Sequence, residues 1–279
     1  MDYDKIINEH YDSVAAESGD LPTSTMADEI TRLMETDIVT RFVAEILRTN
    51  KKAKRLIDVG CGNGYTLSVL AKQFPKLDLT GMEPNKALRD IAELYATEVF
   101  DPIYEPKLPG VRIFNGDVRT PRFHAAEPFD ILICQRVIVN LLDITHQRAA
   151  LDNMLSAVSV GGGLLFIEAF TSGADKLNEA RGEFDLPPLP TPHHNLYLPD
   201  DFFDHQRLMP CRSEGWFVSE NQFSTHYFVT RVLHAAMTQE KPFKRNSEFV
   251  RFFSAALPPG IGNYSPLRVR AFLRAEAVG

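Results

Sequence analysis

The residues best suited to chemistry follow an apolar run that ends near position 60. The stretch DVGCGNGYT, residues 58–66, places Gly60, Gly62 and Gly64 directly behind the run RLIDVG. Residues without a Cβ atom let the backbone of a tight turn approach a ligand closely. A dinucleotide fingerprint would need its third glycine where Tyr65 stands, and a Walker loop would need a following lysine, which is lacking. The spacing therefore indicates a ligand that does not place a diphosphate at this turn.

The pattern D-x-G-x-G-x-G at the end of a first strand resembles the class I methyltransferases that use S-adenosylmethionine (SAM). The resemblance implies an α/β fold with a doubly wound, mostly parallel, seven-stranded sheet. It implies SAM as methyl donor and S-adenosylhomocysteine (SAH) as product, with the zwitterionic methionine end of the donor against the turn. It also implies that Asp58 holds the methionine ammonium, directly or through water, and that the donor is contacted by Gly60, Cys61, Gly62, Asn63 and Gly64.

Further donor contacts are implied by motifs that follow in the order expected of that family. Glu83 lies 19 residues past Gly64, where a carboxylate can accept hydrogen bonds from both ribose hydroxyls, and Pro84 makes the next turn rigid. In NGDVR, Asp117 matches the acid that meets the adenine amino group, and Val118 offers the adjacent backbone N–H.

The methionine end of the donor has its own implied neighbours. The run FDILICQRVIVNL places Gln135 and Arg136 there, and Tyr11 matches an aromatic residue that many small-molecule members place over the donor. Taken singly, each motif has another interpretation. Glu83 also suits a helix cap, Asp117 a turn, Gln135 a surface amide and Tyr11 the core.

Catalytic residues are harder to assign, because transfer from a sulfonium needs mainly positioning and exclusion of water. His193 and His194 lie in the loop TPHHNLYLPDD, and a histidine there could accept a hydroxyl proton, although adjacent histidines also suit an exposed loop. Glu168, at the end of the fifth expected strand, and Asp143, which also suits an N-cap, are rival bases. Neighbouring histidine side chains point apart, so no metal site is expected.

A narrower resemblance concerns the methyl acceptor. The segments QRVIVNLLDITHQRAALDNML, KLNEAR and PHHNLYL are similar to a group of bacterial methyltransferases associated with surface-glycan and secondary-metabolite gene sets. That resemblance implies an acceptor pocket formed by Asn178, Arg181, His194, Asn195 and Tyr197. Because an arginine can pair with a carboxylate or phosphate, the implied acceptor is an anionic or sugar-like small molecule, methylated on an oxygen.

The elements that must position these residues alternate between short apolar runs and longer runs with helical spacing. Strands are expected at 55–60, 77–82, 111–116, 129–135 and 163–169, each continuously apolar, as strands covered on both faces are. Helices are expected at 65–74, 85–100 and 143–158, after two N-terminal helices at about 3–17 and 26–50. This alternation is typical of a parallel sheet with helices on both faces.

The chain divides into five expected parts. Residues 1–54 form a helical lid, and 55–169 form the Rossmann-like core that binds SAM. Residues 170–214 form a substrate cap, expected as an ordered loop because it contains five closely spaced prolines. Residues 215–237 are expected to supply the last two strands of the core, and 238–279 form a C-terminal extension of unassigned role.

Composition argues against several other classes of protein. A formal charge of −7 disfavours a protein whose main task is to bind nucleic acid. The acidic start MDYDKIINEH and the absence of an apolar run of roughly 18 residues predict a cytoplasmic monomer or homodimer with no membrane contact. Cys61, Cys134 and Cys211 form no CxxC pair, which favours buried thiols. Three alternatives stay open: a methyltransferase acting on a peptide, protein or RNA, a SAM-binding protein without catalysis, and an NAD-type oxidoreductase.

Overall fold

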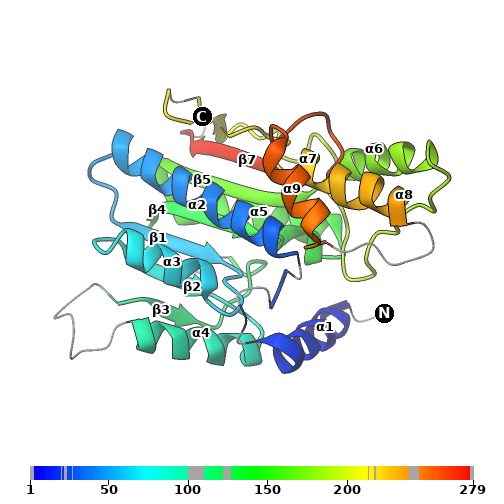
Figure 1. Cartoon of the computed structure of the whole chain (residues 1–279). Helices are drawn as coiled ribbons and strands as arrows, with labels where there is room; N and C mark the ends of the chain where they lie inside the picture. The colour runs from blue at the N-terminus through cyan, green and yellow to red at the C-terminus, as the bar shows by residue number, and fades with distance from the viewer. Residues whose placement is uncertain are drawn as a thin grey trace.

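A seven-stranded sheet forms the centre of the molecule in the computed structural model, which describes residues 3–19, 21, 24–26, 28–99, 110–121, 127–212, 214–216, 218–238 and 245–276. The strand order is β3-β2-β1-β4-β5-β7-β6 (Figure 1). The first five strands in this order are parallel, and β7 is antiparallel to both of its neighbours. This confirms the mostly parallel, doubly wound fold. The strands are Arg55–Val59 (β1), Asp78–Met82 (β2), Arg112–Phe114 (β3), Phe129–Gln135 (β4), Val158–Ala169 (β5), Leu208–Pro210 (β6) and Leu267–Arg274 (β7).

Helices flank this sheet, and α1, α6 and α8 gather at the side where the parallel strands end (Figure 1). A 3-10 turn, Ile138–Asn140, follows β4, and a π-helical segment, Val229–Leu233, joins α7 to α8. None of the helices in the described ranges is both long and apolar enough to cross a bilayer. The α-helices are Tyr3–Ser18 (α1), Glu29–Thr49 (α2), Tyr65–Gln73 (α3), Lys86–Val99 (α4), Ile144–Ala157 (α5), Thr171–Gly182 (α6), Ser224–Phe228 (α7), His234–Thr238 (α8) and Glu248–Ala256 (α9).

The parallel strands are buried on both faces, which explains their continuously apolar sequences. In β1 and β2 every residue after the first is buried. The register pairs Asp58 with Gly81 in β2 and with Ile133 in β4, so the three strands end at nearly the same level. Parallel strands that end together place the residues after them at one edge of the sheet, where α/β folds bind ligands.

The stretch expected as a proline-stiffened loop, 170–214, contains a helix that the sequence interpretation missed. Helix α6 covers Thr171–Gly182 and ends before Pro187, the first proline of the cluster. Proline restricts only its own neighbourhood, so the proline-free part of this stretch was free to form a helix. The rest of the stretch includes the short edge strand β6.

The expectation that 215–237 supplies the last two strands is wrong. Most of its C-terminal half is helical, from Ser224 through Thr238, while residue 217 lies outside the described residues. The segment is buried on several sides, and many of its buried side chains, such as Thr225, His226 and Arg231, are polar; it therefore lacks the one-sided apolar spacing that identifies an amphipathic helix.

The last strand instead comes from the C-terminal extension. Strand β7 pairs antiparallel with β5 from Gly163 opposite Leu273 to Ala169 opposite Leu267, and β6 adds to its other edge. The extension is therefore an integral part of the sheet. The domain boundary expected at residue 238 does not divide the core from a separate unit.

We predict that the aromatic contacts on β5 contribute strongly to stability. Phe166 is fully buried, and its ring centroid lies 4.7 Å from that of Phe203. Phe166→Ala should lower the free energy of unfolding by about 3–5 kcal/mol in urea titrations. The matched variant Phe252→Ala removes a ring that is 65% exposed and should change it by less than about 0.5 kcal/mol. Equal effects of the two substitutions would contradict this assignment of the core.

Candidate active site

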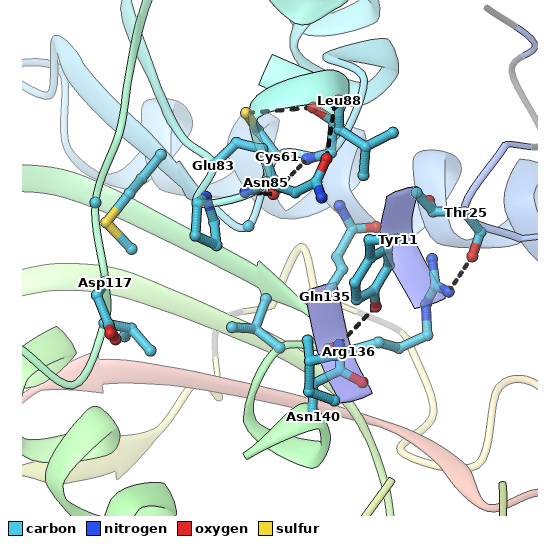
Figure 2. A pocket seen from close by; sticks show the side chains of 18 of the residues that line it. Tyr11, Thr25, Cys61, Glu83, Asn85, Leu88, Asp117, Gln135, Arg136 and Asn140 are labelled. Atoms are coloured by element: carbon cyan, nitrogen blue, oxygen red, sulfur yellow. Dashed lines mark hydrogen bonds between the residues drawn. The ribbon is translucent and has the colours of Figure 1, made fainter. Parts of the chain in front are cut away.

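A cavity of about 420 Å³ lies where β1, β2 and β4 end (Figure 2). The chain leaves β1 for β2 on one side and returns to β4 on the other, so this is the point where the strand order reverses. Of the residues expected to contact a donor, Asp58 and Gly64 do not line the cavity. The wall does include Tyr11, Gly60, Cys61, Gly62, Asn63, Glu83, Pro84, Asp117, Val118, Gln135 and Arg136.

The glycine turn forms one wall, and its backbone conformation requires glycine. Gly60 has φ of 70°, and a Cβ atom there would lie 2.3 Å from Cγ2 of Val137. The amides of Gly60 and Cys61 both donate to the carbonyl oxygen of Met82, at 2.8 and 3.1 Å, which fastens the turn to the end of β2. A side chain on Gly60 would therefore displace the wall that the turn presents to the cavity.

Asp58, in β1 just before the turn, is a buried carboxylate without a hydrogen-bond partner. It is 1% exposed, and neither of its oxygen atoms accepts a hydrogen bond from the described residues. Burial raises the pKa of Asp58 to about 8, although the nearby Arg32 guanidinium opposes this rise. A carboxylate in this state gains most from a bound cation, such as a ligand ammonium group.

Glu83, which follows β2, is also buried but is partly satisfied by the backbone. Its Oε2 accepts from the amide of Gly62 at 2.9 Å, and its Oε1 accepts from the amide of Asn85 at 2.8 Å. Burial raises the pKa of Glu83 to about 7. A carboxylate offers about four acceptor positions, so two stay available to hydroxyl groups of a ligand in the cavity.

Asp117 lies at the far end of the cavity in an ion pair. Its carboxylate accepts from the guanidinium of Arg119 at 2.6 Å, and Arg119 also pairs with Asp4 of α1 at 2.8 Å. Burial would raise the pKa of Asp117, but the hydrogen bonds from Arg119 lower it overall. Because the backbone amide of Arg119 also donates to Asp117, the carboxylate shapes this turn as well as the cavity wall.

Helix α1 covers the cavity through polar contacts. None of its residues is fully buried, so little apolar packing holds it in place. The Tyr11 hydroxyl accepts from the Asn140 amide group at 2.6 Å, and Asp12 accepts from Asn85 at 2.7 Å. After the helix, Asn63 of the glycine turn donates to the carbonyl oxygen of Gly19 at 3.0 Å.

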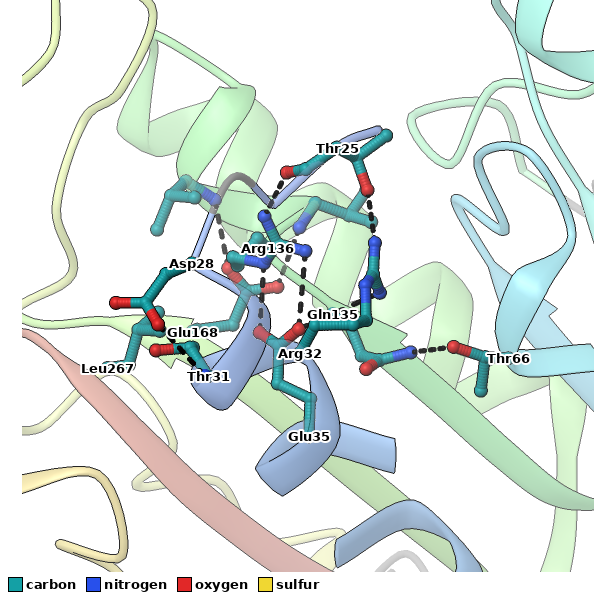
Figure 3. Close-up of polar contacts among 12 residues, drawn as sticks. Thr25, Asp28, Thr31, Arg32, Glu35, Thr66, Gln135, Arg136, Glu168 and Leu267 are labelled. Atoms are coloured by element: carbon teal, nitrogen blue, oxygen red, sulfur yellow. Dashed lines mark hydrogen bonds and ion pairs between the residues drawn. The ribbon is translucent and has the colours of Figure 1, made fainter. Parts of the chain in front are cut away.

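A second polar cluster joins the cavity to α2 (Figure 3). The Arg136 guanidinium donates to the carbonyl oxygen of Thr25 at 2.7 Å and lies 3.0 Å from the buried Glu35 carboxylate. Arg32 donates to the hydroxyl of Thr25 and lies 3.7 Å from the same carboxylate. Two guanidinium groups therefore face the buried Glu35 carboxylate at this end of the cavity, and Arg32 also interacts electrostatically with Asp58.

Glu168 does not face the cavity, so its assignment as a general base is wrong. It is fully buried, and its two oxygen atoms accept from the backbone amides of Val137, Ile138 and Val139 at 3.0, 3.1 and 3.2 Å. Burial raises the pKa of Glu168 to about 7. Its contacts assign it to holding the turn after β4, where Arg136 has φ of 57°.

The two candidate histidines also lie outside the cavity wall. The ring of His194 stacks on His10 of α1 with centroids 3.8 Å apart. Burial lowers the pKa of His194 to about 4, so it is a weak base at neutral pH. His193 packs edge-on against His194, 5.2 Å away. His194 therefore supports α1, and neither ring lines the cavity.

The residues expected to bind the acceptor are not brought together in the cavity. Asn178 exchanges two hydrogen bonds with the backbone of Leu189, and the buried Arg181 donates to the carbonyl oxygens of Pro187 and Arg231. Tyr197 packs against the core, and burial raises its pKa to about 12. Of the residues in this set, Asn195 is connected to the cavity wall by a hydrogen bond, which its side-chain amide donates to Asn140 at 2.8 Å.

Several wall residues were missed by the sequence interpretation. Thr25 precedes α2 and contacts Arg136, 111 positions away, while Arg32 lies in the first turn of α2 and contacts Thr25 and Glu35. Asn140 lies four residues after Arg136, and this spacing was the only feature of the sequence that pointed to Asn140. The remaining missed residues include Tyr3, Asp4, Thr66, Asn85 and Arg119.

We predict that Asp58 makes stability depend on pH without any ligand. A carboxyl whose pKa is raised by folding contributes stability that is fully present below its unfolded value, 3.8, and is lost as pH rises through about 8. The free energy of unfolding of the wild type, measured relative to Asp58→Asn, should therefore fall between about pH 4 and pH 8. Urea titrations across this range test it, and a constant difference would contradict the burial of an unpaired carboxyl.

Comparison with known proteins identifies the family. A family model described as a methyltransferase domain matches residues 30–227, more than half of the chain. No curated protein matches the chain. Magnesium protoporphyrin IX methyltransferase (ChlM) from Synechocystis PCC 6803, solved with bound SAM, is 12% identical over 99% of this chain and 98% of its own, with a TM-score of 0.57. At this identity the likeness concerns the fold alone.

Two further solved structures match over shorter regions. CalS10, an amino pentose methyltransferase from Micromonospora echinaspora, is 31% identical over 47% of this chain and 48% of its own, with a TM-score of 0.38. The sugar N-methyltransferase KedS8 from Streptoalloteichus sp ATCC 53650 is 26% identical over 46% and 44%, with a TM-score of 0.36. The chain thus spans about half the length of these two proteins. The matched family region contains both the glycine turn and the strands that position it, and the chain belongs to the methyltransferase-domain family.

Proposed function

We propose that the protein transfers a methyl group from SAM to an oxygen of a small anionic or sugar-like molecule. The observation that carries this proposal is the pair of buried carboxylates around the glycine turn. Asp58 accepts no hydrogen bond from the described residues, and Glu83 has two unused acceptor positions. A cationic amino group and a ribose with two hydroxyls are the complementary groups of SAM.

The remaining wall residues fit the other parts of the same donor. Asp117 and Val118 line the same cavity, and we assign them to the adenine; the guanidinium groups of Arg32 and Arg136, which also line it, are assigned to the donor carboxylate. When bound, SAM supplies an electrophilic methyl group on a sulfonium. The chain then has to position the acceptor in line and exclude water, and α1 covers the cavity in a manner that suits the second task.

The acidic groups of the described wall support an acceptor that needs no strong base. Glu83 is held by two backbone amides, while Asp4 and Asp117 are paired with Arg119. The described wall contains no histidine. An acceptor that is already ionised, such as a carboxylate, can attack without transferring a proton to the protein.

The alternatives draw less support from the site. An NAD-type oxidoreductase would need a pyrophosphate at the turn, where the buried Asp58 and Glu83 would oppose it electrostatically. A macromolecular acceptor would need access past α1, and the net charge of −7 disfavours RNA.

Calorimetric titration with SAH, SAM and NADH tests the donor. We expect SAH and SAM to bind and NADH to fail; binding of NADH alone would reject the proposal. Transfer of a labelled methyl group from SAM to a metabolite extract would then locate the acceptor. Methylation confined to a protein or RNA fraction would reject the small-molecule assignment while keeping the donor.

A glycine pair gives a matched test of the donor wall. Gly60 and Gly161 both have positive φ, but only a Cβ on Gly60 meets another atom within 4 Å. Gly60→Ala should weaken SAH binding by about tenfold or more, equivalent to roughly 1.4 kcal/mol. Gly161→Ala carries the same backbone strain and should leave SAH affinity unchanged. Equal losses in both variants would show that backbone strain alone, and not the clash of a Gly60 side chain with Val137 in the cavity wall, explains the effect.

A further inference from the structure

A chain of amide groups beside the cavity has a fixed direction of hydrogen bonding. Nδ2 of Asn140 donates to the carbonyl oxygen of Arg136 at 2.9 Å and to the Tyr11 hydroxyl at 2.6 Å. A carbonyl oxygen can only accept, so the Asn140 amide cannot be turned over. Its Oδ1 accepts from Nδ2 of Asn195 at 2.8 Å, and Asn195 is fixed in turn because the same nitrogen donates to the carbonyl oxygen of His194 at 3.0 Å.

The fixed orientation of the Asn140 amide restricts where the hydrogen of the Tyr11 hydroxyl can point. Because the hydroxyl oxygen already accepts from Asn140, its own hydrogen must be directed elsewhere. Within the described ranges, no residue accepts that hydrogen, and Tyr11 lines the cavity together with Arg136. Figure 2 shows the Tyr11 hydroxyl directed at Asn140 at the edge of this space. Burial raises the pKa of Tyr11, so the hydroxyl stays protonated at neutral pH and can donate.

We propose that the Tyr11 hydroxyl, oriented by Asn140 and Asn195, donates a hydrogen bond to the methyl acceptor and selects an oxyanion over an amine. This inference rests on the proposed function and narrows its acceptor to a carboxylate or a similar ionised oxygen.

The selection follows from counting lone pairs. An oxyanion can accept from Tyr11 with one lone pair and attack the methyl carbon with another. A neutral amine has a single lone pair, so accepting the hydrogen bond would remove its nucleophile. With an oxyanion, the new C–O bond forms as the S–C bond breaks, and the bonding pair of the latter leaves on sulfur. The acceptor loses its negative charge and no proton is transferred.

The test measures probe binding to the SAH-saturated protein by ligand-observed NMR. The probes are acetate and benzoate, compared with aniline, an amine that is neutral at pH 7 and close in size to benzoate. We expect the wild type to bind at least one carboxylate more tightly than aniline. Tyr11→Phe should lower carboxylate affinity by about tenfold or more, the usual loss for a hydrogen bond to a charged group, with SAH affinity retained. Tyr264→Phe removes a tyrosine hydroxyl outside the cavity wall and should leave both affinities unchanged.

A polarity-reversing variant sharpens the test. In Asn140→Asp the side chain can no longer donate, so the Tyr11 hydroxyl should donate to it and present lone pairs to the cavity. Carboxylate binding should be lost, and the neutral amine aniline should bind more tightly than to the wild type. If this variant fails to fold by thermal unfolding, Tyr11→Phe alone decides.

The outcomes distinguish failure of the proposed function from failure of the inference about Tyr11. Failure of the wild type to bind SAH would reject the proposed function itself. Normal SAH binding with no carboxylate preference in the wild type, or with equal carboxylate affinity in Tyr11→Phe, would overturn the inference and leave the donor assignment intact.

Discussion

The cost of removing carboxylates from water is the constraint on which this site depends. Three acidic residues stand at the ends of parallel strands, and each is buried. Glu168 is supplied with three backbone amides and Glu83 with two, whereas Asp58 receives none. The series explains their different roles. The satisfied carboxylate shapes the backbone, and the half-satisfied one fixes the glycine turn while facing the cavity. The unsatisfied one, Asp58, is the group that we propose binds the donor ammonium, directly or through water.

The turn held by Glu168 connects the distant parts of the molecule. It carries Arg136, which reaches Thr25 and Glu35 of the N-terminal region, and Asn140, which reaches both Tyr11 and Asn195. Strand β7 places Arg268 opposite Glu168 in the register, so the C-terminal strand lies beside the same position. Segments from both ends of the sequence thus converge on one turn, which gives the cavity a wall that no single motif encodes.

Much of the fold could be predicted because β1, β2, β4 and β5 are continuously apolar runs bounded by turn residues. The glycine turn and Glu83 were predictable because their roles depend on local backbone geometry and on strand order. Arg181 was misassigned because its burial depends on a carbonyl oxygen at Arg231, fifty positions away, which no local pattern reveals. The helices after Ser224 were missed for a related reason: polar and apolar side chains are buried together there, so the amphipathic spacing by which a helix is recognised is absent.

A crystal structure with SAH tests the central assignment most directly. The account predicts that the ammonium group of SAH lies within hydrogen-bonding distance of Asp58, directly or through one water, while both ribose hydroxyls donate to Glu83. A complex in which SAH binds elsewhere, or in which Asp58 stays without a partner while Glu83 contacts only the protein, would contradict it.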